Sequence, residues 1–306
     1  MTPDRQVLDV GGVPVRVSHL DKVLYPATGT TKAELIDYVV HVAPALLAQL
    51  EDRPVTRIRF PDGVGGSPFF EKNVPRGAPD WLRHRRLPAA PGNDEGDEGT
   101  VLDLPFLDDL AGLVWATNAG ALELHTPQWS VSRRGAVRGA DRLVVDLDPG
   151  PGAGLDECAL VAHLVADRLA ADGLTGTVPV TSGSKGMQVY VPLPRRRPPT
   201  EVRQYARDLA HELARAHPTL VVAVMRKELR RGKVLLDWSQ NHPAKTTITP
   251  YSLRGRAEPR VAAPRWWDEV GPGLAQLAPP DVARRLAERG DPFTDGAGEP
   301  GTDEAG

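Results

Sequence analysis

The pattern of apolar and polar positions switches repeatedly between strand-like and helix-like periods along this chain. Residues 5–17 alternate about a Gly-Gly pair, which predicts a hairpin. Residues 30–50 form an amphipathic helical pattern with a Thr cap at its start and Glu34 in its first turn. Further helices are predicted at about 155–171, 200–216 and 279–289.

Strands are predicted where β-branched residues cluster between turn residues. The clearest are "RPVTRIRFP", "LVVDLD", "TVPVTSG", "MQVYVPLP" and "KVLLDWS". Residues 109–129 read either as one helix or as a helix followed by a strand. Because strands outnumber strand–helix–strand units, the pattern favours an α+β fold over a doubly wound sheet. We expect one domain over residues 1–290 and a disordered, acidic, Gly-rich tail over 291–306.

The strand that ends in "DLDPG" carries two carboxylates on one face. Strand side chains alternate, so Asp146 and Asp148 share a face with Val144, while the apolar residues between them face the other way. Pro149 and Gly150 then impose a turn. Two carboxylates this close repel each other unless a cation lies between them.

A third carboxylate, Asp237, ends the apolar run "KVLLDWS" and shares a strand face with Leu235. Three aspartates at neighbouring strand ends would hold two divalent cations, as in phosphoryl or nucleotidyl transfer. Carboxylate ligands favour Mg²⁺ or Mn²⁺ over zinc or copper. Two alternating aspartates taken alone are more often a solvent-facing pair.

The segment "TSGSKGMQVY" suggests a phosphate-binding turn. Gly183 and Gly186 let a backbone approach a ligand, and Ser182, Ser184 and Lys185 can donate to phosphate oxygens. The spacing is not that of a Walker A loop, and a plain hairpin turn remains an alternative. More cations flank Asp237 in the sequence, and arginine forks suit a triphosphate. They are Arg230, Lys233, Lys245, Arg254 and Arg256.

Composition is that of an ordinary globular protein, with 41% hydrophobic and 25% charged residues. The single cysteine, Cys158, excludes a disulfide framework within the chain and the usual zinc sites. Since no apolar run reaches about 18 residues and the N-terminus does not resemble a signal peptide, we expect a cytoplasmic, nucleoid-associated protein with no membrane contact.

Net charge is −3, which neither favours nor excludes nucleic acid. Basic runs at 83–86, 133–134, 194–199 and 226–233 can form a basic face or lie separately in solvated loops.

Six motifs resemble the polymerase domain of bacterial ligase D, a member of the archaeo-eukaryotic primase superfamily that acts in non-homologous end joining. They occur in the family's order through about residues 15–290. They are "DKVLYPATGTTKAELIDY", "GVGGSPFFEKNVP", "ALELHTPQWS", "RLVVDLDPG", "TSGSKGMQVYVPL" and "GKVLLDWSQNHPAKTTITPYSLRGR".

The resemblance implies a primase-polymerase fold, with mixed or antiparallel central sheets flanked by helices, and a role for each matching position. Asp146, Asp148 and Asp237 would be the catalytic, metal-binding triad. Residues around the incoming nucleotide would be His125, Ser182, Lys185, Arg230, Lys233, Gln240 and Arg254. Lys22 and Lys32 would bind the 5′-phosphate of a DNA end. Phe69 and Phe70 would stack on bases nearby, although strand alternation alone predicts one of them buried.

The chain also departs from the family pattern. Gln188 stands where many members have His, which implies a weaker phosphate contact. Ile58 replaces a Lys found in some relatives, so Arg57 and Arg59 would supply the charge for DNA there. The segment between Trp129 and Arg142 is short.

By this resemblance, the protein is a template-directed nucleotidyltransferase that adds NTPs or dNTPs to a 3′-hydroxyl with two Mn²⁺ or Mg²⁺ ions. It would fill short gaps at DNA breaks, with a Ku protein and an ATP-dependent ligase as partners. Alternatives are a primase, an excision-repair polymerase, or a non-catalytic module that binds DNA ends.

Overall fold

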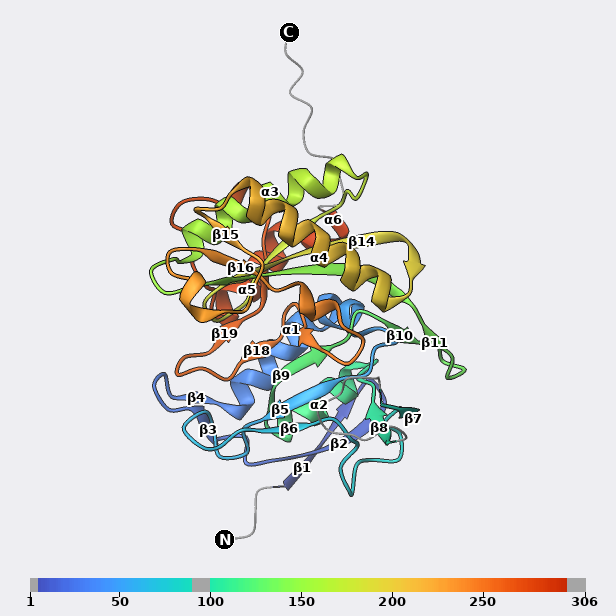
Figure 1. The fold of residues 1–306 in the computed structure, drawn as a ribbon. Helices are drawn as coiled ribbons and strands as arrows, with labels where there is room; N and C mark the ends of the chain where they lie inside the picture. Colours follow the sequence, from blue (N-terminus) through green and yellow to red (C-terminus); the bar gives the residue numbers. More distant parts are fainter. Residues whose placement is uncertain (1–4, 90–99, 296–306) are drawn as a thin grey trace.

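Two β-sheets face each other in the computed structural model, which describes residues 5–89 and 100–295. The larger sheet lies in the upper half of Figure 1 with helices α3 and α4, and the smaller sheet lies in the lower half with α1 and α2. Helices and mixed strands in one chain confirm the predicted α+β class. The residues between the sheets form the candidate site.

The larger sheet has the order β15-β16-β12-β14-β13-β20. Strands β15 and β16 pair in parallel and the other neighbours pair antiparallel, so the sheet is mixed. Its strands are β12 (Ala140–Pro149), β13 (Val178–Thr181), β14 (Met187–Arg197), β15 (Val221–Val222), β16 (Val234–Leu236) and β20 (Ala263–Pro264).

One face of this sheet is apolar and packs on α3 (Leu155–Ala171) and α4 (Pro199–Ala216). Leu143, Val145 and Leu147 of β12 belong to that core, which also holds the buried Cys158 as expected. The alternate residues of β12 point to the opposite face, toward the smaller sheet. The predicted alternation is therefore confirmed, and it leaves the aspartates of β12 outside the helical core.

The smaller sheet has the antiparallel order β17-β9-β5-β6. Its strands are β5 (Thr56–Arg59), β6 (Phe69–Glu71), β9 (Ala121–Thr126) and β17 (Thr247–Ile248). Residues 109–129 thus form helix α2 (Leu110–Asn118) followed by β9, one of the two predicted readings. Strand β17 comes from a distant part of the sequence and joins the C-terminal half to this sheet.

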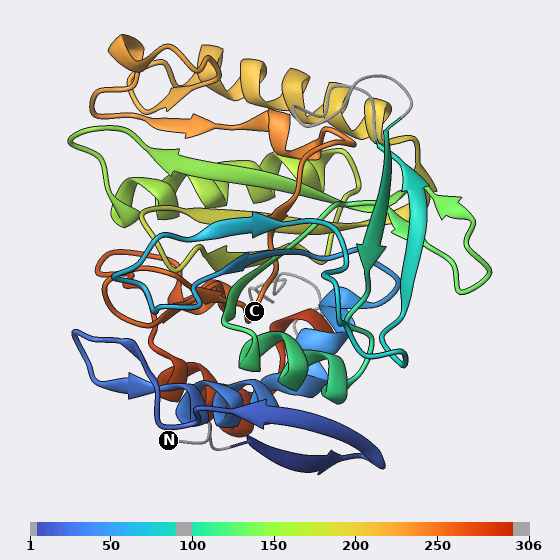
Figure 2. The same cartoon turned by 90° about the horizontal axis from the view of Figure 1, so that it is seen from below.

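Helix α1 (Lys32–Leu50) begins where the cap residues predict. Thr31 Oγ1 accepts from Glu34 N at 3.3 Å, and Glu34 Oε2 accepts from Thr31 N at 2.7 Å, which is a capping box. By length and composition α1 is apolar enough to cross a membrane, although Lys32, Glu34 and Asp37 interrupt it, so it is not a continuous apolar run. A buried core helix meets the same criterion, and α1 packs against α2 and the β1–β2 hairpin (Figure 2).

The remaining elements are short. The paired strands are β1 (Arg5–Val10) with β2 (Val13–Ser18), β3 (Val23–Tyr25) with β4 (Thr30–Thr31), β7 (His84–Pro88) with β8 (Val101–Pro105), β10 (Ser130–Val131) with β11 (Val137–Arg138), and β18 (Leu253–Arg254) with β19 (Arg260–Val261). The helices are α5 (Pro279–Arg289), α6 (Pro292–Asp295), and the 3₁₀ segments η1 (Lys227–Leu229), η2 (Trp238–Asn241) and η3 (Trp267–Glu269).

The predicted start of the tail at residue 291 was wrong. Asp291 is buried and accepts a hydrogen bond from the hydroxyl of Tyr251. Phe293 packs edge-on against Tyr190, with 5.8 Å between ring centroids. These apolar and polar contacts hold residues 291–295 against the domain, and residues 296–306 lie outside the described part of the chain.

Candidate active site

Pairing of β12 with β16 brings the three predicted aspartates together. The register places Leu147 opposite Leu236 and Asp148 opposite Leu235. Asp237 directly follows β16, and its N–H donates to the carbonyl of Asp146 at 2.9 Å. Opposed residues of an antiparallel pair point to the same face, so Asp146 and Asp237 are cross-strand neighbours of like charge.

Each carboxylate is held by a different protein group. Asp146 Oδ1 accepts from Gln188 Nε2 at 3.0 Å, and Asp148 forms an ion pair with Arg230. Asp237 accepts from the N–H of Ser239 at 3.0 Å and from Gln240 Nε2 at 2.9 Å. Gln188 therefore contacts a carboxylate here, whereas its position had been considered only as a phosphate contact.

The raised pKa of Asp146 shows that the three carboxylates have too little positive charge beside them. The pKa of Asp146 is raised to about 7, mainly by burial and also by the charges of Asp237 and Asp148, against the lowering effect of the Gln188 hydrogen bond and the Arg254 charge. In the described residues, no three acidic, His or Cys side chains converge closely enough to enclose a metal ion. The donor chemistry of three neighbouring carboxylates nevertheless fits a hard divalent cation. Arg230 holds Asp148 in this conformation, so a cation would have to displace that guanidinium.

The raised pKa predicts a pH-dependent stability of the metal-free protein. The folded state binds the Asp146 proton more tightly than the unfolded chain does, so this stability is complete below about pH 4 and lost as pH rises to about 7. In EDTA, Asp146→Asn should therefore stabilise the protein by about 2–4 kcal/mol at pH 8 and by little at pH 4. Urea unfolding at both pH values measures the difference, and an equal effect at both would contradict the electrostatic account.

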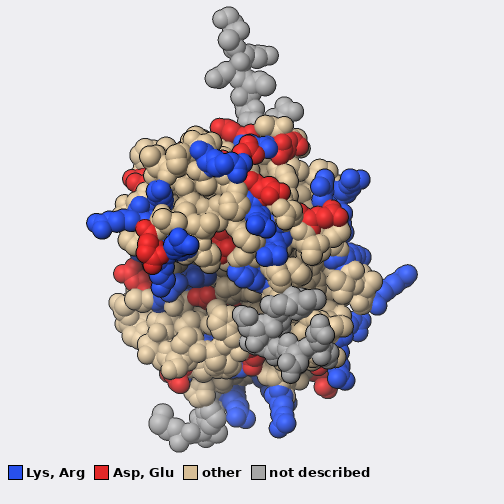
Figure 3. Space-filling view, viewed as in Figure 1, with Lys and Arg blue, Asp and Glu red and all other residues tan. Residues whose placement is uncertain are grey.

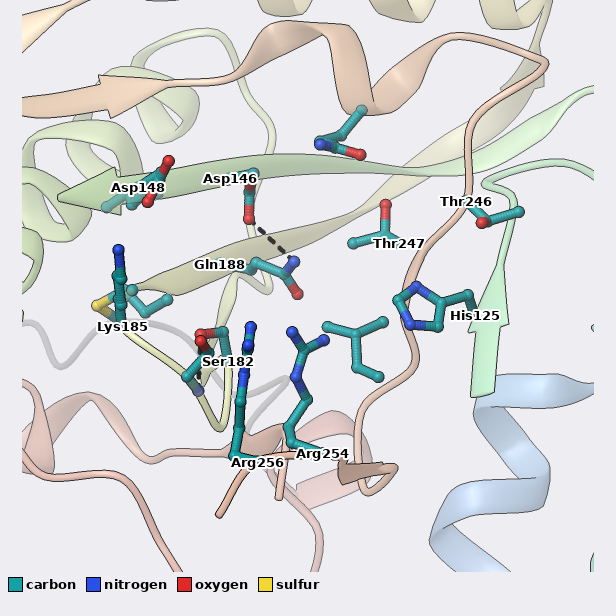
Figure 4. A pocket seen from close by; sticks show the side chains of 16 residues that line it. His125, Asp146, Asp148, Ser182, Lys185, Gln188, Thr246, Thr247, Arg254 and Arg256 are labelled. Carbon is teal, nitrogen blue, oxygen red and sulfur yellow. Dashed lines mark hydrogen bonds between the residues drawn. The ribbon is translucent and has the colours of Figure 1, made fainter. Parts of the chain in front are cut away.

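A cavity of about 360 Å³ opens beside Asp146 and Asp148, between the two sheets. Figure 4 shows Asp146 pointing into it from β12, with Lys185, Ser182, Arg254 and Arg256 on the opposite wall and His125 at the β9 end. In Figure 3, Lys and Arg side chains border the hollow between the halves of the molecule. The predicted nucleotide-site residues that line the cavity are His125, Ser182, Lys185, Gln240 and Arg254.

Arg230 and Lys233, the other two predicted nucleotide residues, do not line this cavity. Arg230 lines a second cavity of about 680 Å³, which shares Asp148 and Lys185 with the first. Its floor is the Pro- and Gly-rich turn after β12, residues 149–154, and Lys227 lies on its wall. Lys233 lines neither cavity, so the structure does not place it at the site.

Glu123, which the sequence reasoning missed, orders two of the predicted residues. Its Oε2 lies 2.9 Å from His125 Nε2 and 3.3 Å from the guanidinium nitrogen Nη1 of Arg254, and its Oε1 accepts from the N–H of Gly255 at 3.0 Å. Burial alone would raise the pKa of Glu123, but the His125 hydrogen bond and the Arg254 charge lower it. The Nε of Arg254 is buried without a protein partner. A donor is thus held beside the cavity and left for a ligand.

We expect Glu123→Gln to raise the KM for nucleotide by about tenfold, because His125 and Arg254 lose their common anchor and its charge. The exchange should also cost about 1–3 kcal/mol of stability, since it removes the charged partner of a buried Arg. Steady-state kinetics and denaturant midpoints measure both effects. The matched control is Glu258→Gln, which removes an exposed carboxylate paired with Arg260. An unchanged KM would show that Glu123 does not position these groups.

The turn between β13 and β14 presents Ser182 and Lys185 because its glycines pack tightly against the protein itself. A Cβ on Gly186 would lie 2.0 Å from the carbonyl oxygen of Leu147, and Gly183 has φ +68°. Gln276 clamps the turn by accepting from Gly183 N at 2.6 Å and donating to Gly186 O at 3.0 Å. The glycines were predicted to allow approach of a ligand, and the structure adds this internal packing. Thr246 and Thr247, also missed, contribute hydroxyl groups to the cavity.

Lys22 and Lys32, predicted to bind a DNA 5′-phosphate, lie together at the start of α1. The ammonium of Lys32 is buried and donates to the carbonyl of Ser18 at 2.8 Å, and Lys22 forms an ion pair with Asp62 at 3.4 Å. Burial and the nearby Lys22 charge lower the pKa of Lys32. Two ammonium groups at the N-terminus of a long helix suit an anion.

The other residues predicted to contact DNA differ in their exposure to solvent. Phe69 and Phe70 are both exposed, at 41% and 63%, so the alternative of one buried ring is wrong. Arg59 lies 5.0 Å from the Phe69 ring and pairs with Glu71 at 3.0 Å. Arg57 is only 1% exposed, pairs with the same Glu71 and stacks on Trp115, so a direct contact between Arg57 and DNA is wrong for this structure. Its burial holds β6, and with it the two rings, against β5.

Comparisons with known proteins point to one family. The family model for the LigD primase-polymerase domain matches residues 31–293. The chain is 46% identical over 278 residues to the multifunctional non-homologous end joining protein LigD of Mycolicibacterium smegmatis, which covers 90% of this chain and 35% of that protein. It is 34% identical to the bifunctional LigD of Bacillus subtilis, covering 92% of this chain and 44% of that protein.

A similar solved structure is the polymerase domain of Mycobacterium tuberculosis ligase D in complex with DNA. The TM-score is 0.84 at 44% sequence identity, covering 90% of this chain and 95% of that one. The chain spans about a third of the length of the mycobacterial relatives that it matches.

Proposed function

This chain belongs to the LigD primase-polymerase family, a family of metal-dependent nucleotidyltransferases, and we propose that it fills short gaps at DNA breaks during end joining. In this reaction a primer 3′-hydroxyl attacks the α-phosphate of an NTP or dNTP opposite a template base, and pyrophosphate leaves. The observation that carries the proposal is a cavity lined by Asp146, Asp148 and Lys, Arg and hydroxyl groups, with Asp237 as the cross-strand neighbour of Asp146.

We assign Asp146, Asp148 and Asp237 to two divalent ions, Mn²⁺ or Mg²⁺. When bound, such ions activate the attacking hydroxyl and stabilise charge on the leaving pyrophosphate. The protein supplies the rest of the electrostatics. Lys185 and the guanidinium of Arg254 face the cavity from the wall opposite the aspartates, where they can neutralise the phosphates of the nucleotide.

Arg230 has two possible anions within reach. In this structure it pairs with Asp148, and it also lines the second cavity beside Lys185 and Lys227. A triphosphate whose outer phosphates extend into that cavity would attract Arg230 away from Asp148. Nucleotide binding would then free this carboxylate for a cation.

Recognition of a DNA end is assigned to the start of α1 and to β6. Lys22 and Lys32 would hold a 5′-phosphate on the strand downstream of the gap, and Phe69 and Phe70 would stack on exposed bases. The related structure is a complex with DNA, which supports DNA as a ligand. A Ku protein, an ATP-dependent ligase and a cytoplasmic, nucleoid-associated location belong to the same proposal.

A primer-dependence assay separates this function from its alternatives. The protein is incubated with Mn²⁺ and nucleotides on a short-gap duplex, with or without a downstream 5′-phosphate, and on unprimed single strands. Extension of the gapped duplex, stimulated by the phosphate, is expected. Unprimed synthesis would identify a primase, extension indifferent to the phosphate an excision-repair polymerase, and no extension a DNA-binding module.

A further inference from the structure

Two arginine side chains lie over Trp238, the residue that follows Asp237, outside both cavities. Arg203 and Arg207 of α4 lie over its indole ring, with their guanidinium carbons 5.0 and 5.5 Å from the ring centroid. Burial lowers the pKa of His242, and the nearby charges of Arg203 and Lys245 lower it as well. We name these five residues the α4 ledge.

The ledge carries an excess of positive charge, and its Lys245 donates to the neutral hydroxyl of Ser239, which in turn donates to Asp237. Within residues 5–89 and 100–295, no carboxylate forms an ion pair with Arg203, Arg207 or Lys245, although two cations four residues apart on one helix face repel each other. The Nε of Arg203 is buried and has no hydrogen-bond partner. Stacking on Trp238 fixes both guanidinium groups in place, so they are ready to receive an anion.

The ledge lies outside both cavities, so the anion that it binds is not the triphosphate of the nucleotide. Trp238 packs into the core between α4 and the larger sheet, and its indole N–H donates to the carbonyl of Ala223 at 3.2 Å. Its neighbour Asp237 lies opposite Asp146, which lines the catalytic cavity. In Figure 1, α4 runs above the orange segment that carries these residues. None of the five ledge residues lines either cavity, and the nucleotide phosphates already have cations inside them.

We infer that the α4 ledge binds the sugar-phosphate backbone of the primer, the DNA strand whose 3′ end enters the catalytic cavity; this rests on the proposed function. Residues 238–245 directly follow Asp237 and carry three of the five ledge residues, so a strand that ends beside Asp237 and runs along this segment reaches the ledge. Guanidinium and ammonium groups contact phosphate without reading sequence, as a polymerase that extends any primer requires.

The test is the double variant Arg203→Gln/Arg207→Gln. Gln keeps helix propensity and removes both charges. Fluorescence anisotropy at several salt concentrations measures binding of a primer–template with a recessed 3′ end. The dissociation constant should rise by at least about tenfold, and the slope of log K against log salt should fall by about two. The KM for nucleotide at saturating DNA should not change.

Two further variants keep the test decisive. Arg215→Gln makes the same exchange in the last turn of α4, away from Trp238, and should leave binding and salt slope unchanged. Lys245→Gln changes an exposed side chain that does not threaten folding, and should lower the slope by about one. If the folded double variant and Lys245→Gln bind primer–template like the parent protein, the inference is wrong.

Matched DNA ligands show which strand the ledge binds. They also distinguish a failure of the ledge inference from a failure of the proposed function. Equal losses on unprimed template strand would show that the ledge holds the template, which overturns the assignment to the primer. If the parent protein binds primer–template but extends nothing, the proposed function fails while the binding result still decides the ledge. If it extends normally and the ledge variants bind normally, only the ledge fails.

Discussion

Asp146→Asn is expected to lower nucleotide incorporation by about 10³-fold while the protein becomes more stable at pH 8. A cation at such a site contributes several kcal/mol to the transition state, and each 1.36 kcal/mol is a factor of ten in rate. Stability changes in the opposite sense because the exchange removes a buried charge next to Asp237 and Asp148. Single-turnover extension of a gapped duplex and urea unfolding in EDTA measure the two effects.

The opposite signs distinguish a catalytic carboxylate from a structural one. A residue that only maintains the fold would lose activity and stability together. Affinity for gapped DNA without nucleotide should stay within about threefold of the parent protein, since Asp146 makes no contact assigned to DNA. Full activity of the folded variant would remove Asp146 from the catalytic site.

Lys22→Gln and Lys32→Gln are expected to abolish the preference for a DNA end that carries a 5′-phosphate. Charged hydrogen bonds of this kind contribute about 1.5–3 kcal/mol, so affinity for phosphorylated DNA should fall by about 10–100-fold. Affinity for the same DNA with a 5′-hydroxyl should change little. Lys22→Gln is the cleaner variant because Lys22 is partly exposed, whereas Lys32 is buried against Ser18 and Asn118.

The 5′-hydroxyl DNA serves as the internal control because it uses every other contact. A parallel loss on both DNAs would show that these lysines support folding or general DNA affinity. Retention of the phosphate preference in both folded variants would place the phosphate elsewhere.

Local periodicity was enough to predict the main elements of the site. The alternation in β12 set the facing of Asp146 and Asp148, and the cap at Thr31 set the start of α1. Contacts between distant segments were not accessible in this way. That Asp237 lies opposite Asp146 depends on strand register, and the clamp of the 182–186 turn by Gln276 joins residues about 90 positions apart.

The errors at β5 and β6 have the same origin. Arg57 and Arg59 share a strand face and look equivalent in the sequence, and both pair with Glu71, but only Arg57 is buried, where it stacks on Trp115. Alternation predicts one buried ring in the Phe69–Phe70 pair, yet β6 is an edge strand and both rings remain exposed. In each case packing against other elements determined the exposure of the side chain. The sequence pattern of a single strand does not predict such contacts.

The most direct test of the central claim is single-nucleotide addition on a one-nucleotide gap with a 5′-phosphate, using each of the four nucleotides separately, with Mn²⁺ or with EDTA. A template-directed nucleotidyltransferase adds only the nucleotide complementary to the template base, and only when the divalent ion is present. No addition under any condition, or addition of all four nucleotides irrespective of the template, would contradict the account.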